Sequence, residues 1–228
     1  MLAMSSQSAS AVHSAGRPSL AYNLASLAVL AMLVAIGAAY LIAELGRGDA
    51  VPAPSLADAN PIMQTISGRE LAIPQTWFRY GEQIRNGFTN QIDLRIAFAP
   101  DGSAASLPVD ITLLPRSRAR TSASLLDRVY LHQFADNTLQ GVPGLVGKPM
   151  QQLNGYAGES VWYDALSPNP FVAKCQAPVA ADAGTQCVRT VYLSSGIAAI
   201  YTFDAALLQS WRSFDPEIRR WLAPIGAW

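Results

Sequence analysis

The chain contains 228 residues, half of them hydrophobic, and its 16 basic and 16 acidic residues give a formal net charge of zero at pH 7. Two residues of each sign precede Val51, so the remaining 14 basic and 14 acidic residues also cancel. Because general nucleic-acid binding needs a net basic surface, this balance excludes a nucleic-acid partner from the functions that we expect.

An apolar run from Leu24 to Ala43 predicts a membrane anchor. Its twenty residues carry no charge and would span about 30 Å as a helix, the thickness of a bilayer's hydrocarbon core. A cleaved signal peptide would instead have a shorter apolar core followed by a small-x-small site. We therefore predict a disordered, small and polar segment over 1–20, an uncleaved transmembrane helix over 21–45 and a linker over 46–64.

Small residues form a stripe along this predicted transmembrane helix. They recur every fourth residue and so share one helix face, as Ala31, Ala35, Ala39 and Ala43. Such stripes let transmembrane helices approach closely, which makes these alanines candidates for helix–helix packing with a membrane-protein partner. The general abundance of alanine in this chain is the alternative explanation.

Periodicity predicts that 65–228 form one exported α+β domain with many strands. In the segment 91–99 apolar side chains occupy every second position, which is typical of a strand with one buried face. Shorter apolar runs between turn residues predict further strands at 70–73, 108–114, 146–153, 158–166, 171–176, 187–193 and 197–203.

Two segments of the domain have helical spacing instead. One runs from Ser122 to Phe134, with Thr121 or Ser122 as its N-cap, and the other from Ala206 to about Leu222, where Asp215-Pro216 is a candidate break. We therefore expect an antiparallel sheet with a central helix and a C-terminal helix packed on it.

Four short motifs suggest a family. They are Leu71-Ala-Ile-Pro74 followed by Trp77, Leu125-Leu126-Asp127-Arg128, the turn Gly155-Tyr-Ala-Gly158, and Trp211-Arg-Ser-Phe214-Asp215-Pro216-Glu217-Ile218. Their order resembles the PsbP-like α/β sandwich over Glu70 to Leu222. The resemblance implies a non-catalytic accessory or binding module. It transfers no active-site residues, because that family has no shared catalytic set.

The two cysteines give the clearest indication of cellular compartment. Cys175 and Cys187 are separated by eleven residues and are interpreted as a disulfide that clamps a β-hairpin loop, with free thiols as the alternative. Disulfides persist in oxidising compartments, which favours export of the domain. Flanking positive charge usually indicates the cytoplasmic side of a membrane helix, but here one Arg lies on each side, so charge alone does not decide the orientation. We therefore predict a single-pass inner (plasma) membrane protein with a cytoplasmic N-terminus and a periplasmic or extracellular domain.

Arginines gather before and within the central helix. Three of them alternate along the chain and would point the same way on an extended segment, namely Arg116, Arg118 and Arg120. Together with Arg128 they are candidates for contact with lipid phosphates or an acidic partner. The alternative is a solvated loop with Asp110 and Asp127 as counter-charges.

His132 is the one histidine in the domain and lies four residues before Asp136. A histidine oriented by a carboxylate can serve as a general base, and a serine beside it would complete a triad. There is no G-x-S-x-G motif, so a solvated helix position is the favoured interpretation. A zinc site would need three or four ligands, and we expect neither metal nor cofactor.

Taken together, these patterns predict a non-catalytic accessory or partner-binding subunit of an inner-membrane complex. Two alternatives stay open. One is a module that binds lipid or a small apolar ligand between the sheet and a helix, and the other is a hydrolase that uses His132.

Overall fold

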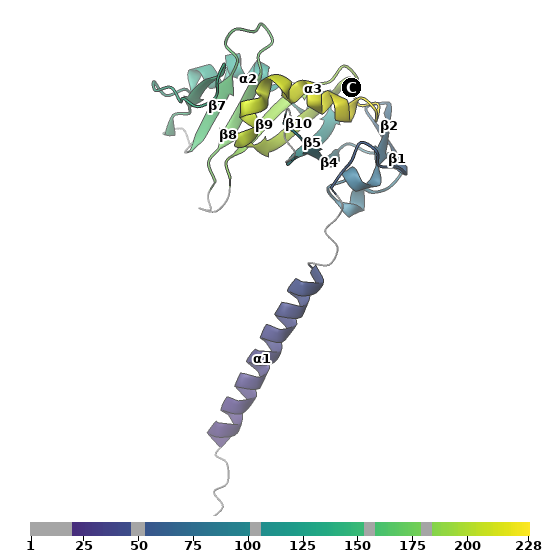
Figure 1. Ribbon diagram of the computed structural model, residues 1–228, viewed down its shortest axis with the longest axis vertical. Helices are drawn as coiled ribbons and strands as arrows, with labels where there is room; N and C mark the ends of the chain where they lie inside the picture. The colour runs from purple at the N-terminus through teal and green to yellow at the C-terminus, as the bar shows by residue number, and fades with distance from the viewer. Residues whose placement is uncertain (1–19, 47–52, 101–105, 153–157, 179–183) are drawn as a thin grey trace, which may run out of the picture. The chain divides into compact units, whose positions relative to one another are not determined.

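The computed structural model describes residues 20–46, 53–100, 106–152, 158–178 and 184–228 (Figure 1). The chain divides into two compact units, Met1–Val51 and Pro52–Trp228. The first unit contains the helix α1 (Leu20–Gly46), whose 27 residues correspond to about 40 Å of helix. Its stretch Leu24–Leu41 is long and apolar enough to cross a membrane, and the side chains there are exposed in the free chain. Apart from Leu20, the predicted disordered segment lies outside the described residues.

The second unit is the predicted α+β domain, and its larger sheet has seven strands. Every neighbouring pair is antiparallel, in the order β4-β5-β10-β9-β8-β7-β6. The strands are β4 (Ile92–Phe98), β5 (Leu107–Pro115), β6 (Val146–Pro149), β7 (Glu159–Tyr163), β8 (Val172–Gln176), β9 (Gln186–Tyr192) and β10 (Ile197–Asp204). This sheet confirms the predicted fold class.

A smaller three-stranded sheet precedes the larger one. Its order is β2-β1-β3, with β1 (Pro61–Ile66), β2 (Arg69–Pro74) and β3 (Gly87–Phe88). The predicted linker over 46–64 therefore ends too late, because β1 already begins at Pro61. Gln64 and Ile66 are the buried residues of β1, and Gln64 is polar. Because so few apolar side chains are buried, the sequence of β1 has a weak hydrophobic pattern and resembles a linker.

The helix α3 (Trp211–Leu222) packs on one face of the larger sheet and forms the main core (Figure 1). Each strand sends alternate side chains to this face. Phe214 lies within the layer, and its ring centroid is 4.6 Å from that of Phe203 and 5.2 Å from that of Phe98. Phe214 is fully buried, which stabilises the fold by about 1.5–3 kcal/mol for such a side chain.

The proline inside α3 does not interrupt this helix. The candidate break at Asp215-Pro216 is absent, and the change in geometry comes earlier, where a 3-10 helix (Ala205–Ser210) passes into α3. Pro216 removes one intrahelical hydrogen bond. Phe214 and Ile218 on either side of it are fully buried, so their packing holds the helix on the sheet.

The helix α2 (Ser122–Arg128) contributes to a second, smaller hydrophobic cluster. Leu126 and Tyr130 pack there with Val161 and Val172 from strands β7 and β8. The predicted helix from Ser122 to Phe134 is too long, because the backbone leaves the helical region at Val129 and continues as a 3-10 helix over Tyr130–His132. This turn brings Phe134 against Tyr163, with ring centroids 5.9 Å apart.

Candidate partner-binding surface

The connection between β5 and α2 carries the arginines that the sequence singles out. Pro115 ends β5, and the chain then makes a 3-10 turn over Arg116–Arg118 before extending again at Ala119. The expectation of one extended segment, with its arginines aligned by alternation, is therefore wrong. The turn nevertheless gathers the same three side chains, because Arg116, Arg118 and Arg120 all line one hollow.

We call this feature the arginine hollow, and it has a volume of about 640 Å³. Tyr192 of β9 forms its aromatic wall, with the Arg116 guanidinium 4.3 Å above the centre of its ring. The Tyr192 hydroxyl donates to the carbonyl oxygen of Ala119 at 2.8 Å, which fixes the ring against the loop. Arg118 Nη1 donates to the carbonyl oxygen of Asn90 at 3.3 Å. Two of the three guanidinium groups are thus held in place although all three side chains are exposed.

The carboxylates expected to neutralise these arginines do not do so. Asp110 instead accepts from Arg95 Nε at 2.6 Å and lies 3.1 Å from Arg79 Nη1. Asp127 is exposed on α2 and forms no ion pair with the arginines of the hollow. Within the described ranges, no carboxylate pairs with the guanidinium groups that line the arginine hollow.

Arg128 does not belong to this group. It is exposed on the last turn of α2, where a positive charge complements the negative end of the helix dipole, and it does not line the arginine hollow. The sequence grouped four arginines, and the structure brings three of them together.

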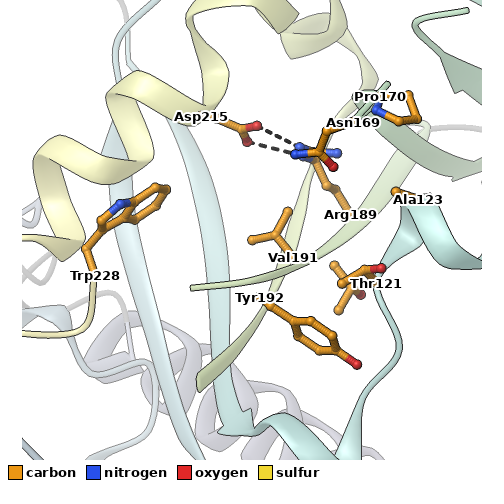
Figure 2. A pocket seen from close by; sticks show the side chains of 10 residues that line it. Thr121, Ala123, Asn169, Pro170, Arg189, Val191, Tyr192, Asp215 and Trp228 are labelled. Carbon is orange, nitrogen blue, oxygen red and sulfur yellow. Dashed lines mark hydrogen bonds and ion pairs between the residues drawn. The ribbon is translucent and has the colours of Figure 1, made fainter. Parts of the chain in front are cut away.

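A second hollow, which we call the edge hollow, shares Tyr192 with the arginine hollow and has a volume of about 390 Å³ (Figure 2). Its other walls come from Thr121 before α2, from Asn169 and Pro170 before β8, and from the C-terminal Trp228. No local sequence pattern indicates this site, because its residues come from five separate parts of the chain.

An ion pair between the buried Arg189 and the partly exposed Asp215 borders the edge hollow, as Figure 2 shows. Arg189 is buried and donates to both carboxylate oxygens of Asp215, at 3.2 Å from Nε and 2.6 Å from Nη2. Its guanidinium also lies 4.4 Å from the centre of the Phe171 ring. Burial, and then the charge of Asp215, raises the pKa of the nearby Tyr201 phenol, so Tyr201 stays neutral at physiological pH.

Among the described residues, His132 does not have the neighbours that the hydrolase alternative requires. It is exposed on the short 3-10 helix, and Asp136 lies beyond the end of that helix, so the two do not share a continuous helix face. None of the described residues forms a hydrogen bond with its imidazole. In the part of the chain that the structure describes, no three His, Cys, Asp or Glu side chains gather in a way that could hold a metal ion.

Cys175 and Cys187 form a disulfide between paired positions of β8 and β9. Both are buried in the main core, so the bond joins the two strands from inside the domain. The alanines of the predicted stripe face solvent in the free chain at Ala31, Ala35 and Ala39, while the side chain of Ala43 lies outside the described residues. The helix-packing role of this stripe stays a prediction.

No protein-family model matches the sequence, and no curated protein matches it either. Among solved structures, the chain is similar to Smlt3025, an immunity protein of the Stenotrophomonas maltophilia type IV secretion system. That likeness has a TM-score of 0.49 and 11% identity, and it covers 72% of this chain and 92% of the other.

The chain is also similar to the iron-regulated outer membrane lipoprotein FrpD of Neisseria meningitidis. Here the TM-score is 0.48 with 9% identity, over 77% of this chain and 96% of the other. The resemblance to the PsbP-like family stays a prediction.

Proposed function

We propose that this chain is a membrane-anchored, exported, non-catalytic protein that binds a protein partner within an inner-membrane complex, and that the arginine hollow is its binding surface. The observation that carries the proposal is the set of three exposed guanidinium groups around one hollow, without a carboxylate partner among the described residues. A partner that supplies carboxylates would complete these pairs.

Side chains of the arginine hollow are held in position before any partner binds, which supports this function. Arg and Tyr are enriched among the residues that dominate protein–protein binding energies. Arg116 is stacked on Tyr192, and Tyr192 is tied to the loop through its hydroxyl. A guanidinium that is already positioned loses less conformational freedom when it binds.

The anchor and the disulfide support the proposed location. Helix α1 fits a signal anchor by its length and composition, and a disulfide between Cys175 and Cys187 suggests an oxidising compartment. We propose that the N-terminus is cytoplasmic and the domain periplasmic. Neither hollow favours the apolar-ligand alternative, because arginines and other polar groups contribute to the lining of both.

Site-specific cross-linking in cells tests this function. A photo-cross-linking amino acid replaces Ser117, which is exposed within the arginine hollow and makes no hydrogen bond in the described part of the chain. We expect the full-length protein to yield one defined protein adduct. The triple variant Arg116→Gln, Arg118→Gln, Arg120→Gln should reduce that adduct at least tenfold.

Arg128→Gln is the matched control, because it removes an exposed arginine of the same region that does not line the hollow. Its adduct should equal that of the unmodified protein. An adduct that survives the triple variant, or one that falls equally in the control, would exclude the arginine hollow as the partner-binding surface.

A further inference from the structure

Strands β8 and β9 separate before β9 ends. They are paired at Gln176 with Gln186, at Cys175 with Cys187 and at Lys174 with Val188. The next hydrogen-bonding position in this register would join Val172 and Thr190, but each has another partner. The Thr190 amide donates to Ser122 Oγ at 2.8 Å, and the Val172 carbonyl accepts from Arg189 Nη1 at 3.3 Å.

The separation leaves the main chain of Tyr192 at an open edge. Leu193 N–H donates to Ile197 on the β10 side, so the main-chain groups of Tyr192, one residue earlier, point away from β10. The register would place Pro170 opposite Tyr192, and a proline has no N–H to offer. Tyr192 faces Ala198 of β10 at a non-hydrogen-bonded position, and among the described residues its amide makes no other hydrogen bond. The edge hollow lies at this point of the strand.

The two hollows are linked through Tyr192. Its side chain is a wall of the arginine hollow, and the residue also lines the edge hollow (Figure 2). Thr121, which lines the edge hollow, directly follows Arg120 of the arginine hollow. One bound segment can therefore reach both the guanidinium groups and the open strand edge.

We infer that the partner contributes an extended acidic segment, which pairs with the main chain of Tyr192 in the edge hollow and places its carboxylates against Arg116, Arg118 and Arg120. Exposed strand edges accept extended peptides through main-chain hydrogen bonds, and side-chain contacts then give selectivity. The positive charge of the arginine hollow requires the opposite charge on the segment. This inference rests on the proposed function and adds the partner's conformation and charge.

A protein segment fits these features better than a lipid surface does. Contacts of lipid surfaces with basic proteins depend on clusters of four or more charges and need no strand edge. Here three arginines adjoin an amide that has no hydrogen-bond partner among the described residues, and two of the arginines are held by Tyr192 and Asn90. Fixed guanidinium forks match a carboxylate in a defined position.

Defined peptides test the inference on the full-length protein in discs of neutral phosphatidylcholine. The probe is a fluorescein-labelled decapeptide with blocked termini. One half alternates Val and Thr, the other half is rich in Glu, and two versions are made, with either half at the N-terminus. One comparison peptide replaces Glu with Gln. Another is N-methylated in the Val/Thr half, so that it cannot donate main-chain hydrogen bonds. Fluorescence anisotropy measures binding, and NMR of protein labelled with ¹⁵N-tyrosine measures hydrogen exchange at the Tyr192 amide.

We expect one order of the acidic peptide to bind at least tenfold more tightly than its Gln or N-methylated version, and to slow exchange at the Tyr192 amide at least tenfold. Asn169→Trp should block binding by filling the edge hollow, and Asn169→Ala should not. Asn169 suits this test because its exposed side chain makes no hydrogen bond to the described residues.

Four results would overturn the inference. If the N-methylated peptide binds as tightly as the acidic peptide and hydrogen exchange at the Tyr192 amide is unchanged, strand pairing is excluded. The proposed function would still stand in that case if the cross-link depends on the three arginines. Equal binding of the Gln peptide, or no binding by either order, would exclude an acidic segment. Protection of Tyr192 that rises with protein concentration and needs no peptide would identify a second copy of the chain as the occupant.

Discussion

At the scale of single residues, Asp93 shows how a buried carboxylate is kept ionised. It lies in β4 and is buried, yet it accepts hydrogen bonds from Thr112 at 2.6 Å and from Gln83 and Gln91 at 2.8 Å each. Burial is the largest single effect and would raise its pKa. The hydrogen bonds from Thr112, Gln91 and Gln83, with the charge of Arg79, outweigh burial and hold the pKa of Asp93 below its usual value.

This lowered pKa predicts a pH-dependent contribution to stability. The stabilisation is complete above the unfolded pKa of about 3.9 and is lost as pH falls through the lower folded pKa. Asp93→Asn should therefore cost about 1–3 kcal/mol of unfolding free energy at pH 7 and distinctly less at pH 3. Urea unfolding of both proteins at the two pH values measures this. A cost that stays constant with pH would contradict it.

At the scale of secondary-structure elements, the disulfide between β8 and β9 stabilises a pair of strands that soon separates. The two cysteines face each other across the pair of strands. The next pair, Lys174 with Val188, is the last before the strands separate toward the edge hollow. The loop that they close contains only eleven residues, so loop closure is local. By chain-entropy reasoning, closing a loop of roughly this length is worth about 3 kcal/mol.

Removing the disulfide should therefore destabilise the domain. The double variant Cys175→Ala, Cys187→Ala is expected to lose about 3 kcal/mol of unfolding free energy, measured by urea denaturation. A reducing agent should destabilise the unmodified protein and leave the double variant unchanged. If the reducing agent affects neither protein, the thiols are not joined in solution.

At the scale of the whole molecule, the chain combines two units with different solvent requirements. Helix α1 presents apolar side chains that no described residue of its own unit covers, whereas Pro52–Trp228 buries a core of its own. Exposed apolar area of this extent is costly in water and stable in a bilayer. The domain is therefore expected to need α1 for its location rather than for its folding.

Fractionation and proteolysis test this division. The full-length protein should stay in the membrane pellet after alkaline extraction, and a chain without residues 1–46 should become soluble. In a Gram-negative host, protease should digest the domain once the outer membrane is opened, before the inner membrane is broken. Digestion only after inner-membrane lysis would reverse the proposed orientation.

The sequence by itself determined the features that depend on local patterns. The uncharged run from Leu24 to Ala43 predicts α1 because crossing a bilayer needs only length and apolarity. Alternation over Ile92–Phe98 predicts β4 because a strand with one buried face has a period of two. The adjacent Trp162 and Tyr163 must face opposite sides of the sheet, and they pack in the two separate hydrophobic clusters.

Only the tertiary structure decided the features that depend on distant partners. Asp110 could not be assigned from sequence because Arg79 and Arg95 compete for it with the nearer arginines of the loop. The helix predicted to Phe134 ends at Arg128, after which the chain turns and Phe134 meets Tyr163 on β7. The open edge at Tyr192 exists because Ser122 takes the amide of Thr190, a contact between residues 68 positions apart. Local patterns fix which elements form, whereas the pairing of distant side chains fixes where those elements stop and which groups stay available for a partner.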